Sequence, residues 1–291
     1  MGELSSYIRK LDSDLLSAFE DRDRFLPIDL CIGELPSRLW LDAAELVDEA
    51  KQKYQAFLGG GPAAFEVFVK FTDLGEQKRF AERVESASLD ARHYVFRWDF
   101  AIRADLARGV AHAQLHYGSL GSVDSILRIA YALHSIGRGA VLFHSASLRM
   151  DGKAMALIGG TGAGKSELSK RLGAEVFSDE LTMIREQDSA MWIHGTPFHG
   201  QFPKFANAKA PLSIIIALRE RAEAPPIETN AAAVRFLMRH VFFFGDAPQT
   251  SELLLTQITR IVNRVPVRSF LLDRSLDAEN LRESLIELCA P

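Results

Sequence analysis

Cysteine is scarce in this chain. Cys31 and Cys289 stand far apart, and neither has a second cysteine close to it. Disulfide frameworks and zinc sites built from cysteine need several closely spaced cysteines, so the sequence indicates neither. We expect both thiols to be reduced and to lie in the core.

Long apolar runs are missing as well. No apolar run reaches the length of about 18 residues that a membrane-spanning helix needs, and the opening MGELSSYIRKLDSDLL places charges where a signal peptide has an apolar segment. We therefore expect a cytoplasmic protein that does not associate with a membrane.

Neither sign of charge is in large excess. The chain has 34 Lys and Arg against 38 Asp and Glu, a formal net charge of −4, which argues against a nucleic-acid-binding surface. With 47% hydrophobic and 25% charged residues over 291 positions, the composition is that of a globular protein long enough for two modest domains.

The N-terminal part is predicted to mix helices and strands. Apolar residues at helical spacing predict helices over 4–19, 43–58 and 122–136. Short or alternating apolar runs predict strands over 27–32, 65–71, 93–102 and 110–116. Pro36 is expected to end the first strand or to bend the chain, and the glycines before Pro62 predict a loop.

The C-terminal part alternates strands with helices, which is typical of an α/β layer structure. Strands are predicted over 140–143, 153–158, 175–184 (interrupted at 178–180), 212–218 and 267–272, and helices over 166–172, 230–244, 251–263 and 278–288. The apolar cluster Val241–Phe244 is expected to be a helix end buried in the core. Gly137 and Gly139 suggest a hinge, so we expect one domain over 1–137 and another over 138–291.

The most informative segment is Gly159–Ser166, GGTGAGKS, which matches the phosphate-loop pattern G-x-x-x-x-G-K-[ST] at every position. Glycines let successive backbone N–H groups curl around a phosphate, Lys165 would reach the outer phosphates, and the Ser166 hydroxyl would bind magnesium. An apolar run precedes the loop and a helical pattern follows it, as the motif requires.

This segment has two other interpretations. A glycine-rich turn with a stray lysine is the simplest alternative, and the flanking strand and helix patterns count against it. A dinucleotide-binding fingerprint is excluded, because G-x-G-x-x-G starting at Gly160 would need glycine where Lys165 stands.

An acidic pair follows the loop. Asp179 and Glu180 come 14 and 15 residues after Lys165, at the point where a neighbouring strand would return beside the loop. A nucleotide site needs an acidic group to hold magnesium, and a kinase also needs a base for the attacking hydroxyl. The alternative is that both acids are solvated and cap a loop.

The run from His144 to Glu180, HSASLRMDGKAMALIGGTGAGKSELSKRLGAEVFSDE, resembles the catalytic domain of the HPr serine kinase/phosphorylase family and its kinase-like relatives. The shared features are a histidine before the loop, a loop that continues G-K-S-E, and an acidic pair after the helix. The resemblance covers about half the chain, from Gly139 onward. It implies the phosphoenolpyruvate carboxykinase-like nucleotide-binding fold, preceded here by a smaller mixed α+β domain.

The resemblance implies a role for each matching residue. Lys165, His144 and the acidic pair Asp179 and Glu180 would be catalytic, and Ser166 and Asp179 would hold magnesium. The nucleotide would be bound by Gly159, Gly160, Thr161, Gly162, Ala163, Gly164, Lys165, Ser166 and Glu167.

The sequence departs from the family at two points. The family's catalytic acid is normally aspartate where Glu180 stands, so either Glu180 or Asp179 would be the base. The glycine-rich signature that follows this acid in HPr kinase/phosphorylases is absent, which removes the ground for expecting phosphorolysis or HPr as substrate. Instead, Gly195–Gly200 reads GTPFHG and resembles the GTPxxG loop of HPr-kinase-like proteins found beside peptide-modifying systems.

His199 in this segment would help to hold an acceptor or a phosphate, or would only cap the loop.

The sequence therefore predicts a kinase that uses ATP and Mg²⁺ to phosphorylate a hydroxyl. By resemblance the acceptor is a serine of a protein or peptide, with a small-molecule alcohol as the alternative, and the N-terminal domain would recognise it. No nucleic acid or membrane partner is expected, and a homo-oligomer is compatible with the family. The rival functions are an ATP-binding regulatory module and a simple NTPase; a carboxykinase is disfavoured because its further motifs are not evident.

Overall fold

The computed structural model describes residues 2–17, 19, 23–72, 83–116, 120–198, 200, 206–219 and 226–289. Over these residues the protein is a mixed α/β structure with two mixed β-sheets and seven α-helices. Two compact units can be distinguished, unit 1 (Met1–Arg138 with Phe243–Glu252) and unit 2 (Gly139–Phe242 with Leu253–Pro291). The segment 243–252, expected in the second domain, belongs to unit 1.

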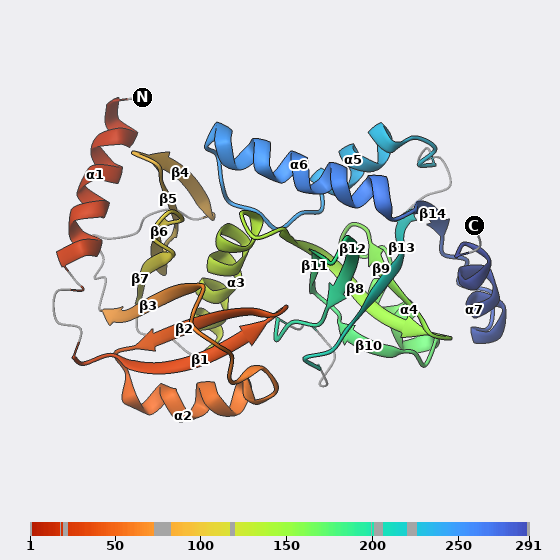
Figure 1. Ribbon diagram of the computed structural model, residues 1–291, viewed down its shortest axis with the longest axis horizontal. Coiled ribbons are helices and arrows are strands. Elements are labelled where there is room, and N and C mark those ends of the chain that lie inside the picture. Colours follow the sequence, from red (N-terminus) through yellow and green to blue (C-terminus); the bar gives the residue numbers. More distant parts are fainter. Residues whose placement is uncertain are drawn as a thin grey trace. The chain divides into compact units, whose positions relative to one another are not determined.

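Unit 1 is built on a seven-stranded sheet of order β1-β2-β3-β7-β6-β5-β4 (Figure 1). β2, β3 and β7 are parallel, and the other neighbours are antiparallel. The strands are β1 (Leu26–Ile32), β2 (Leu35–Leu41), β3 (Phe65–Thr72), β4 (Glu85–Leu89), β5 (Arg92–Arg97), β6 (Phe100–Asp105) and β7 (Val110–His116). The helices are α1 (Gly2–Ser17), α2 (Ala44–Lys53), a 3-10 turn over Gln55–Phe57, and α3 (Leu120–Ile136).

Helices cover both faces of this sheet (Figure 1). On one face, Leu11 and Leu15 of α1 belong to the same apolar cluster as Phe68 of β3. On the other face, Phe65 of β3 meets Tyr131 of α3 edge to face, with ring centroids 4.9 Å apart. Residues at odd and even positions of a strand point to opposite faces, so β3 supplies both layers.

Two predictions for unit 1 were wrong in part. The strand expected over 93–102 is two strands, because the chain reverses at Trp98 and Asp99, where Trp98 is 53% exposed. Asp99 accepts hydrogen bonds of 2.6 and 2.7 Å from Arg97 across this turn. Pro36 does not end the first strand or bend the chain: the turn lies before it, at Gly33 and Glu34, and Pro36 is within β2, opposite Cys31.

Unit 2 contains the second seven-stranded sheet (Figure 1). Its strands are β8 (Ala140–Met150), β9 (Lys153–Ile158), β10 (Glu175–Ser178), β11 (Leu181–Gln187), β12 (Ala190–His194), β13 (Lys209–Arg219) and β14 (Val267–Leu271). Its helices are α4 (Lys165–Arg171), α5 (Asn230–Met238), α7 (Ala278–Glu287) and most of α6 (Pro248–Arg264), whose first residues belong to unit 1.

The strand pairings of unit 2 form a closed cycle. β8 pairs with β9 and β11, β12 joins β11 to β13, and β13 pairs in turn with β9. The two eleven-residue strands β8 and β13 change partner along their length, which allows the cycle to close. Leu168 of α4 and Leu281 and Leu285 of α7 pack in one apolar cluster with residues of β8, β9 and β13.

The helix expected over 230–244 ends early. α5 stops at Met238, and the amides of Arg239 and His240 bond to carbonyls three residues back, which tightens its last turn. The chain then runs along β8, with the carbonyl of His240 accepting from the amide of His144 at 2.9 Å and the amide of Phe242 donating to Leu142 at 2.8 Å. Val241–Phe244 is therefore a partly exposed extended segment and not a buried helix end.

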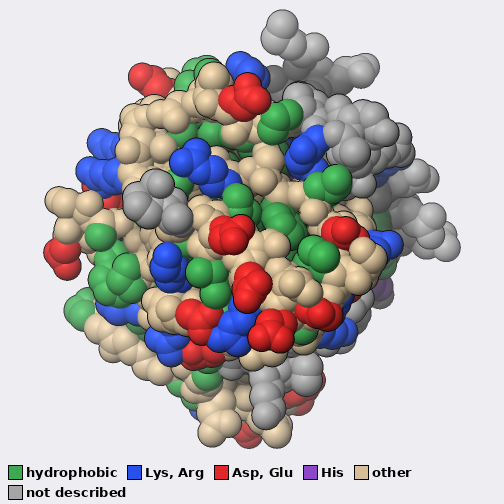
Figure 2. All heavy atoms as spheres, turned by 90° about the vertical axis from the view of Figure 1, so that its right-hand side faces the viewer, with side chains coloured by type: hydrophobic (Ala, Val, Ile, Leu, Met, Phe, Trp, Pro, Cys, Tyr) green, Lys and Arg blue, Asp and Glu red, His purple; other side chains and the backbone are tan. Residues whose placement is uncertain are grey.

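The two thiols differ from expectation in their location. Cys31 and Cys289 form no disulfide within the described part of the chain, and both are only partly buried. No helix among the described residues is long and apolar enough to cross a membrane. Figure 2 shows the face that carries α7, on which acidic and basic side chains are mixed. Arg282 of α7 contributes one such pair, since its Nε donates to Asp151 at 2.9 Å.

The ring of a buried histidine in unit 1 has no hydrogen bond to any described residue. The side chain of His134 in α3 is 1% exposed, and neither ring nitrogen has a hydrogen-bond partner in the described part of the chain. Its ring lies flat on that of Phe65, with centroids 4.7 Å apart and an interplanar angle of 5°. Burial, with the positive charge of Arg138, lowers the pKa of His134 to about 3.

We expect His134 to make the free energy of unfolding depend on pH. The unfolded chain binds a proton there near pH 6.5 and the folded chain only near pH 3, so stability falls as the pH drops between these values. The loss between pH 7 and pH 5 is about 2 kcal/mol. His134→Phe should remove this loss in chemical denaturation at the two pH values. His116→Phe, at an exposed position of β7, is the matched control and should keep it; an unchanged slope in His134→Phe would contradict the assignment.

Candidate functional site

The predicted phosphate loop lies between β9 and α4. Gly162 and Gly164 have φ angles of 86° and 91°, a region that glycine adopts without steric cost. A Cβ at Gly159 would lie 3.0 Å from the carbonyl oxygen of Leu218 on β13, so a side chain there would press on the neighbouring strand. The glycines of the motif are thus required both by backbone conformation and by packing.

Lys165 is the first residue of α4, and its side chain folds back over the loop. Its Nζ donates to the carbonyl oxygens of Gly159 at 2.7 Å and Gly160 at 2.9 Å. The ammonium group therefore lies within reach of the backbone that would surround a bound phosphate.

The acidic pair forms the connection between β10 and β11. Asp179 is 5% exposed, and its Oδ1 accepts the backbone N–H of Gly200 at 2.8 Å. Glu180 is partly exposed, and its backbone carbonyl accepts the N–H of Ser145 on β8 at 3.1 Å. The strand expected over 175–184 with an interruption at the acids is confirmed as two strands with the acids between them.

The register of β8 brings the loop and the acids together. Ser145 is opposite Ile158, the residue before the loop, and His144 is opposite Leu181, the residue after the acids. β11 lies on one side of β8, followed along the same side by β10, and β9 lies on the other side. The glycine loop and the acidic pair therefore leave the sheet beside the same dipeptide of β8.

One cavity of about 720 Å³ opens where these segments meet. Three cations and three carboxylates line it, together with two histidines. The lining residues are His144, Gly159, Gly160, Thr161, Gly162, Gly164, Lys165, Ser166, Glu167, Asp179, Glu180, Arg239, His240 and Arg274.

Most residues predicted for the site line this cavity, with two exceptions. Ala163 turns its side chain into the apolar core, where it is 6% exposed, and its amide donates to the carbonyl of Gly160 at 3.2 Å. His199 lies outside the described residues, although its neighbour Gly200 contacts Asp179.

Three cavity residues were missed from the sequence. Arg239 and His240 follow α5 and reach the site because the next residues pair with β8. Arg274 comes from the segment after β14, where its Nε lies 3.4 Å from Oε2 of Glu167. No local pattern marks these residues, apart from the position of Arg239 at a helix C-terminus, where cations are favourable.

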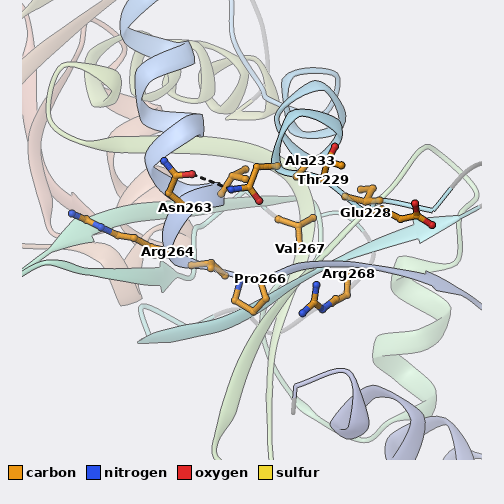
Figure 3. A pocket seen from close by; sticks show the side chains of 12 residues that line it. Glu228, Thr229, Ala233, Asn263, Arg264, Pro266, Val267 and Arg268 are labelled. Carbon is orange, nitrogen blue, oxygen red and sulfur yellow. Dashed lines mark hydrogen bonds between the residues drawn. The ribbon is translucent and has the colours of Figure 1, made fainter. Parts of the chain in front are cut away.

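A second cavity in unit 2, of about 360 Å³, is shown in Figure 3. It lies beside the start of α5 and the start of β14, and none of the predicted site residues lines it. Asn230 donates to Asn263 at 3.2 Å across it, and the charged ends of Glu228 and Arg264 extend away from each other (Figure 3). Its charged groups do not converge on one point, so the phosphate-loop cavity is the better candidate for chemistry.

No model of a known protein family matches this chain, and no curated protein matches it either.

Proposed function

We propose that this protein is a Mg·ATP-dependent kinase that transfers the γ-phosphoryl group to a hydroxyl. The observation that carries the proposal is the single cavity lined by the glycine loop, by His144 and by the acidic pair Asp179 and Glu180, three segments that are separate in the sequence. Phosphoryl transfer needs an anion cradle, an oxygen ligand for the metal and a base for the hydroxyl. Each has a candidate in this cavity.

We infer an HPr kinase-like, phosphoenolpyruvate carboxykinase-like fold for unit 2. The order of the segments along the chain supports this inference: His144 comes first, the glycine loop follows β9, and the acidic pair follows β10. The pairing of β8 beside the loop and beside the acidic pair supports it as well. The resemblance over 144–180 supports the same assignment.

Magnesium fits the oxygen donors of the cavity. Among the described residues, no group of three or more His, Cys, Asp or Glu side chains is arranged to hold a metal ion. Mg²⁺ is usually held by one or two carboxylates with substrate phosphates and water, so such a group is not required. The Ser166 hydroxyl and the Asp179 carboxylate would hold the ion, which when bound would neutralise charge on the β- and γ-phosphates.

The two acids are suited to different roles. Asp179 is buried and is oriented by the amide of Gly200, as suits a fixed ligand. Glu180 is partly exposed in the cavity and would accept the proton of the acceptor hydroxyl. As that proton leaves, the acceptor oxygen bonds to the γ-phosphorus, the bond to the β–γ bridging oxygen breaks, and ADP departs.

The cations of the cavity would stabilise the transferred group. The loop amides and Lys165 would bind the β- and γ-phosphates, so the Lys165 ammonium would exchange its carbonyl contacts for phosphate oxygens. Arg239 is exposed at the end of α5 and would add a second positive charge, while Arg274 already faces Glu167.

The acceptor class follows from the resemblance, which favours a serine of a protein or peptide over a small alcohol. We assign its recognition to unit 1 and propose the cytoplasm as the compartment. Unit 1 has a cavity of its own, of about 510 Å³. Its lining combines aromatic rings with arginines, among them Phe19, Phe68, Arg92, Arg103, Arg108 and His112.

Lys165→Ala should abolish transfer. Removing the ammonium takes away charge stabilisation of the outer phosphates, so we expect transfer of labelled γ-phosphate into a cell extract to fall about 100-fold or more. Lys170→Ala, an exposed lysine on the same helix, is the matched control and should keep wild-type transfer. Release of free phosphate independent of any acceptor would indicate an NTPase, and tight ATP binding without either product would indicate a regulatory module.

Glu180→Gln and Asp179→Asn should separate the roles of the two acids. Glu180→Gln removes the base and should lower kcat by about 10²- to 10⁴-fold with ATP affinity retained. Asp179→Asn should raise the Mg²⁺ concentration needed for half-maximal activity. If steady-state kinetics at varied Mg²⁺ show that Asp179→Asn lowers kcat and Glu180→Gln raises the Mg²⁺ requirement, the two assignments must be exchanged.

Arg239→Ala should lower kcat by about tenfold or more, because a cation on the transferred phosphoryl group is lost. Arg235→Ala lies one turn earlier on α5, is exposed and does not line the cavity, so it should have wild-type kinetics. Equal kinetics of the two variants would remove Arg239 from the mechanism.

A further inference from the structure

In the mechanism above, the segment that begins at Gly195 enters only through the amide of Gly200, yet it has further contacts with the turn that carries the acidic pair. Its threonine, Thr196, is fully buried, and its Oγ1 donates to the backbone carbonyl of Leu181 at 2.5 Å. The hydroxyl of Ser178 donates to the same oxygen at 2.5 Å. Ser178 and Leu181 flank Asp179 and Glu180, so one carbonyl receives two hydroxyls at the base of the acidic turn.

The end of the segment touches both carboxylates. The N–H of Gly200 donates to Oδ1 of Asp179 at 2.8 Å. A Cβ on Gly200 would lie 3.4 Å from Oδ2 of Asp179 and 3.7 Å from Oε2 of Glu180. These are ordinary contact distances, so a methyl group would fit, but it would lie against both acids.

The start of the segment is fixed by close packing. A Cβ on Gly195 would overlap the carbonyl oxygen of Ala206 and lie 2.9 Å from that of Phe177. The N–H of Gly195 donates to the carbonyl of Ala208 at 2.9 Å. With Gly195 held in this way and Thr196 bonded to Leu181, the backbone has little freedom to shift relative to the acidic turn.

We propose that Thr196 and Gly200 are positioning residues of the acidic pair, with Gly195 holding the backbone before Thr196. The hydroxyl of Thr196 holds the acidic turn through its bond to the carbonyl of Leu181. The amide of Gly200 orients the Asp179 carboxylate, and the missing side chain of Gly200 leaves space beside Glu180. The inference rests on the proposed kinase function. It explains why glycine and threonine occupy these positions in a loop that itself carries no catalytic group among its described residues.

The first variants are Thr196→Val and Thr196→Ser. Valine keeps the shape and removes the donor, so the acids lose their alignment, and displacement by about 1 Å can cost about 100-fold in rate. We expect kcat to fall about 10- to 100-fold with the KM for ATP within about twofold, and serine to restore most of the rate. Thr182→Val, which removes another fully buried hydroxyl on a carbonyl of the same unit, should lose stability but keep kcat. Equal losses of kcat in Thr196→Val and Thr182→Val would overturn the proposal.

Gly200→Ala tests the proposal without removing a buried group. Its methyl against both carboxylates should weaken metal binding, so the tightening of ATP binding by Mg²⁺ over EDTA, measured by calorimetry, should shrink several-fold. Wild-type Mg²⁺ dependence in both Gly200→Ala and Thr196→Val would overturn the proposal. The calorimetry needs no turnover, so a wild-type protein that binds Mg·ATP but transfers nothing would refute the kinase function while the positioning role is still decided by the binding data.

Discussion

The register of strand β8 against the strands on its two sides is the constraint on which the candidate site depends. On one side the strand pairs with β11 up to His144 and with β10 from Ser147, and on the other side it pairs with β9 from Ser145 onward. The pairing with β11 holds the residue after the acidic pair, and the pairing with β9 holds the residue before the glycine loop. A slip of one residue in either ladder would turn side chains to the opposite face and separate the two segments. The chemistry proposed for the cavity therefore rests on backbone hydrogen bonds more than on any side-chain contact.

The two units each hold a carboxylate in place by a different kind of contact. In unit 1, Asp12 of α1 receives hydrogen bonds from Tyr94 and Arg103 of the sheet, and Arg103 is only 3% exposed. Burial alone would raise the pKa of Asp12, but these two bonds outweigh it and lower the pKa. A charged contact thus attaches a helix to the sheet. In unit 2 the buried acid of the site, Asp179, is held by the backbone amide of Gly200, and Gly195 in the same segment has no space for a Cβ, so main-chain geometry directs this carboxylate.

The parts of the structure that could be predicted from sequence are those set by neighbours in the chain. The glycine loop and its flanking strand and helix follow from local spacing, and the position of Asp179 and Glu180 follows from the return of the next strand. Arg239 and His240 could not be found in this way, because pairing with a strand almost a hundred residues earlier brings them to the cavity. The turn at Trp98 could not be predicted, because the alternation of apolar and polar residues continues through it. The GTPFHG segment that begins at Gly195 could be recognised in the sequence, but the contact of Thr196 with Leu181 could not be predicted from it.

The segment 243–252 belongs to unit 1 although it is flanked on both sides by unit 2. The chain therefore passes between the units three times, and the second passage comes two residues after Val241, immediately beyond the extended segment that pairs with β8. Within unit 1, Asp246 accepts a hydrogen bond from Ser88 of β4. A fragment that begins after Arg138 would consequently carry ten residues, 243–252, without the sheet of unit 1 to which they belong. The two units are therefore best expressed together.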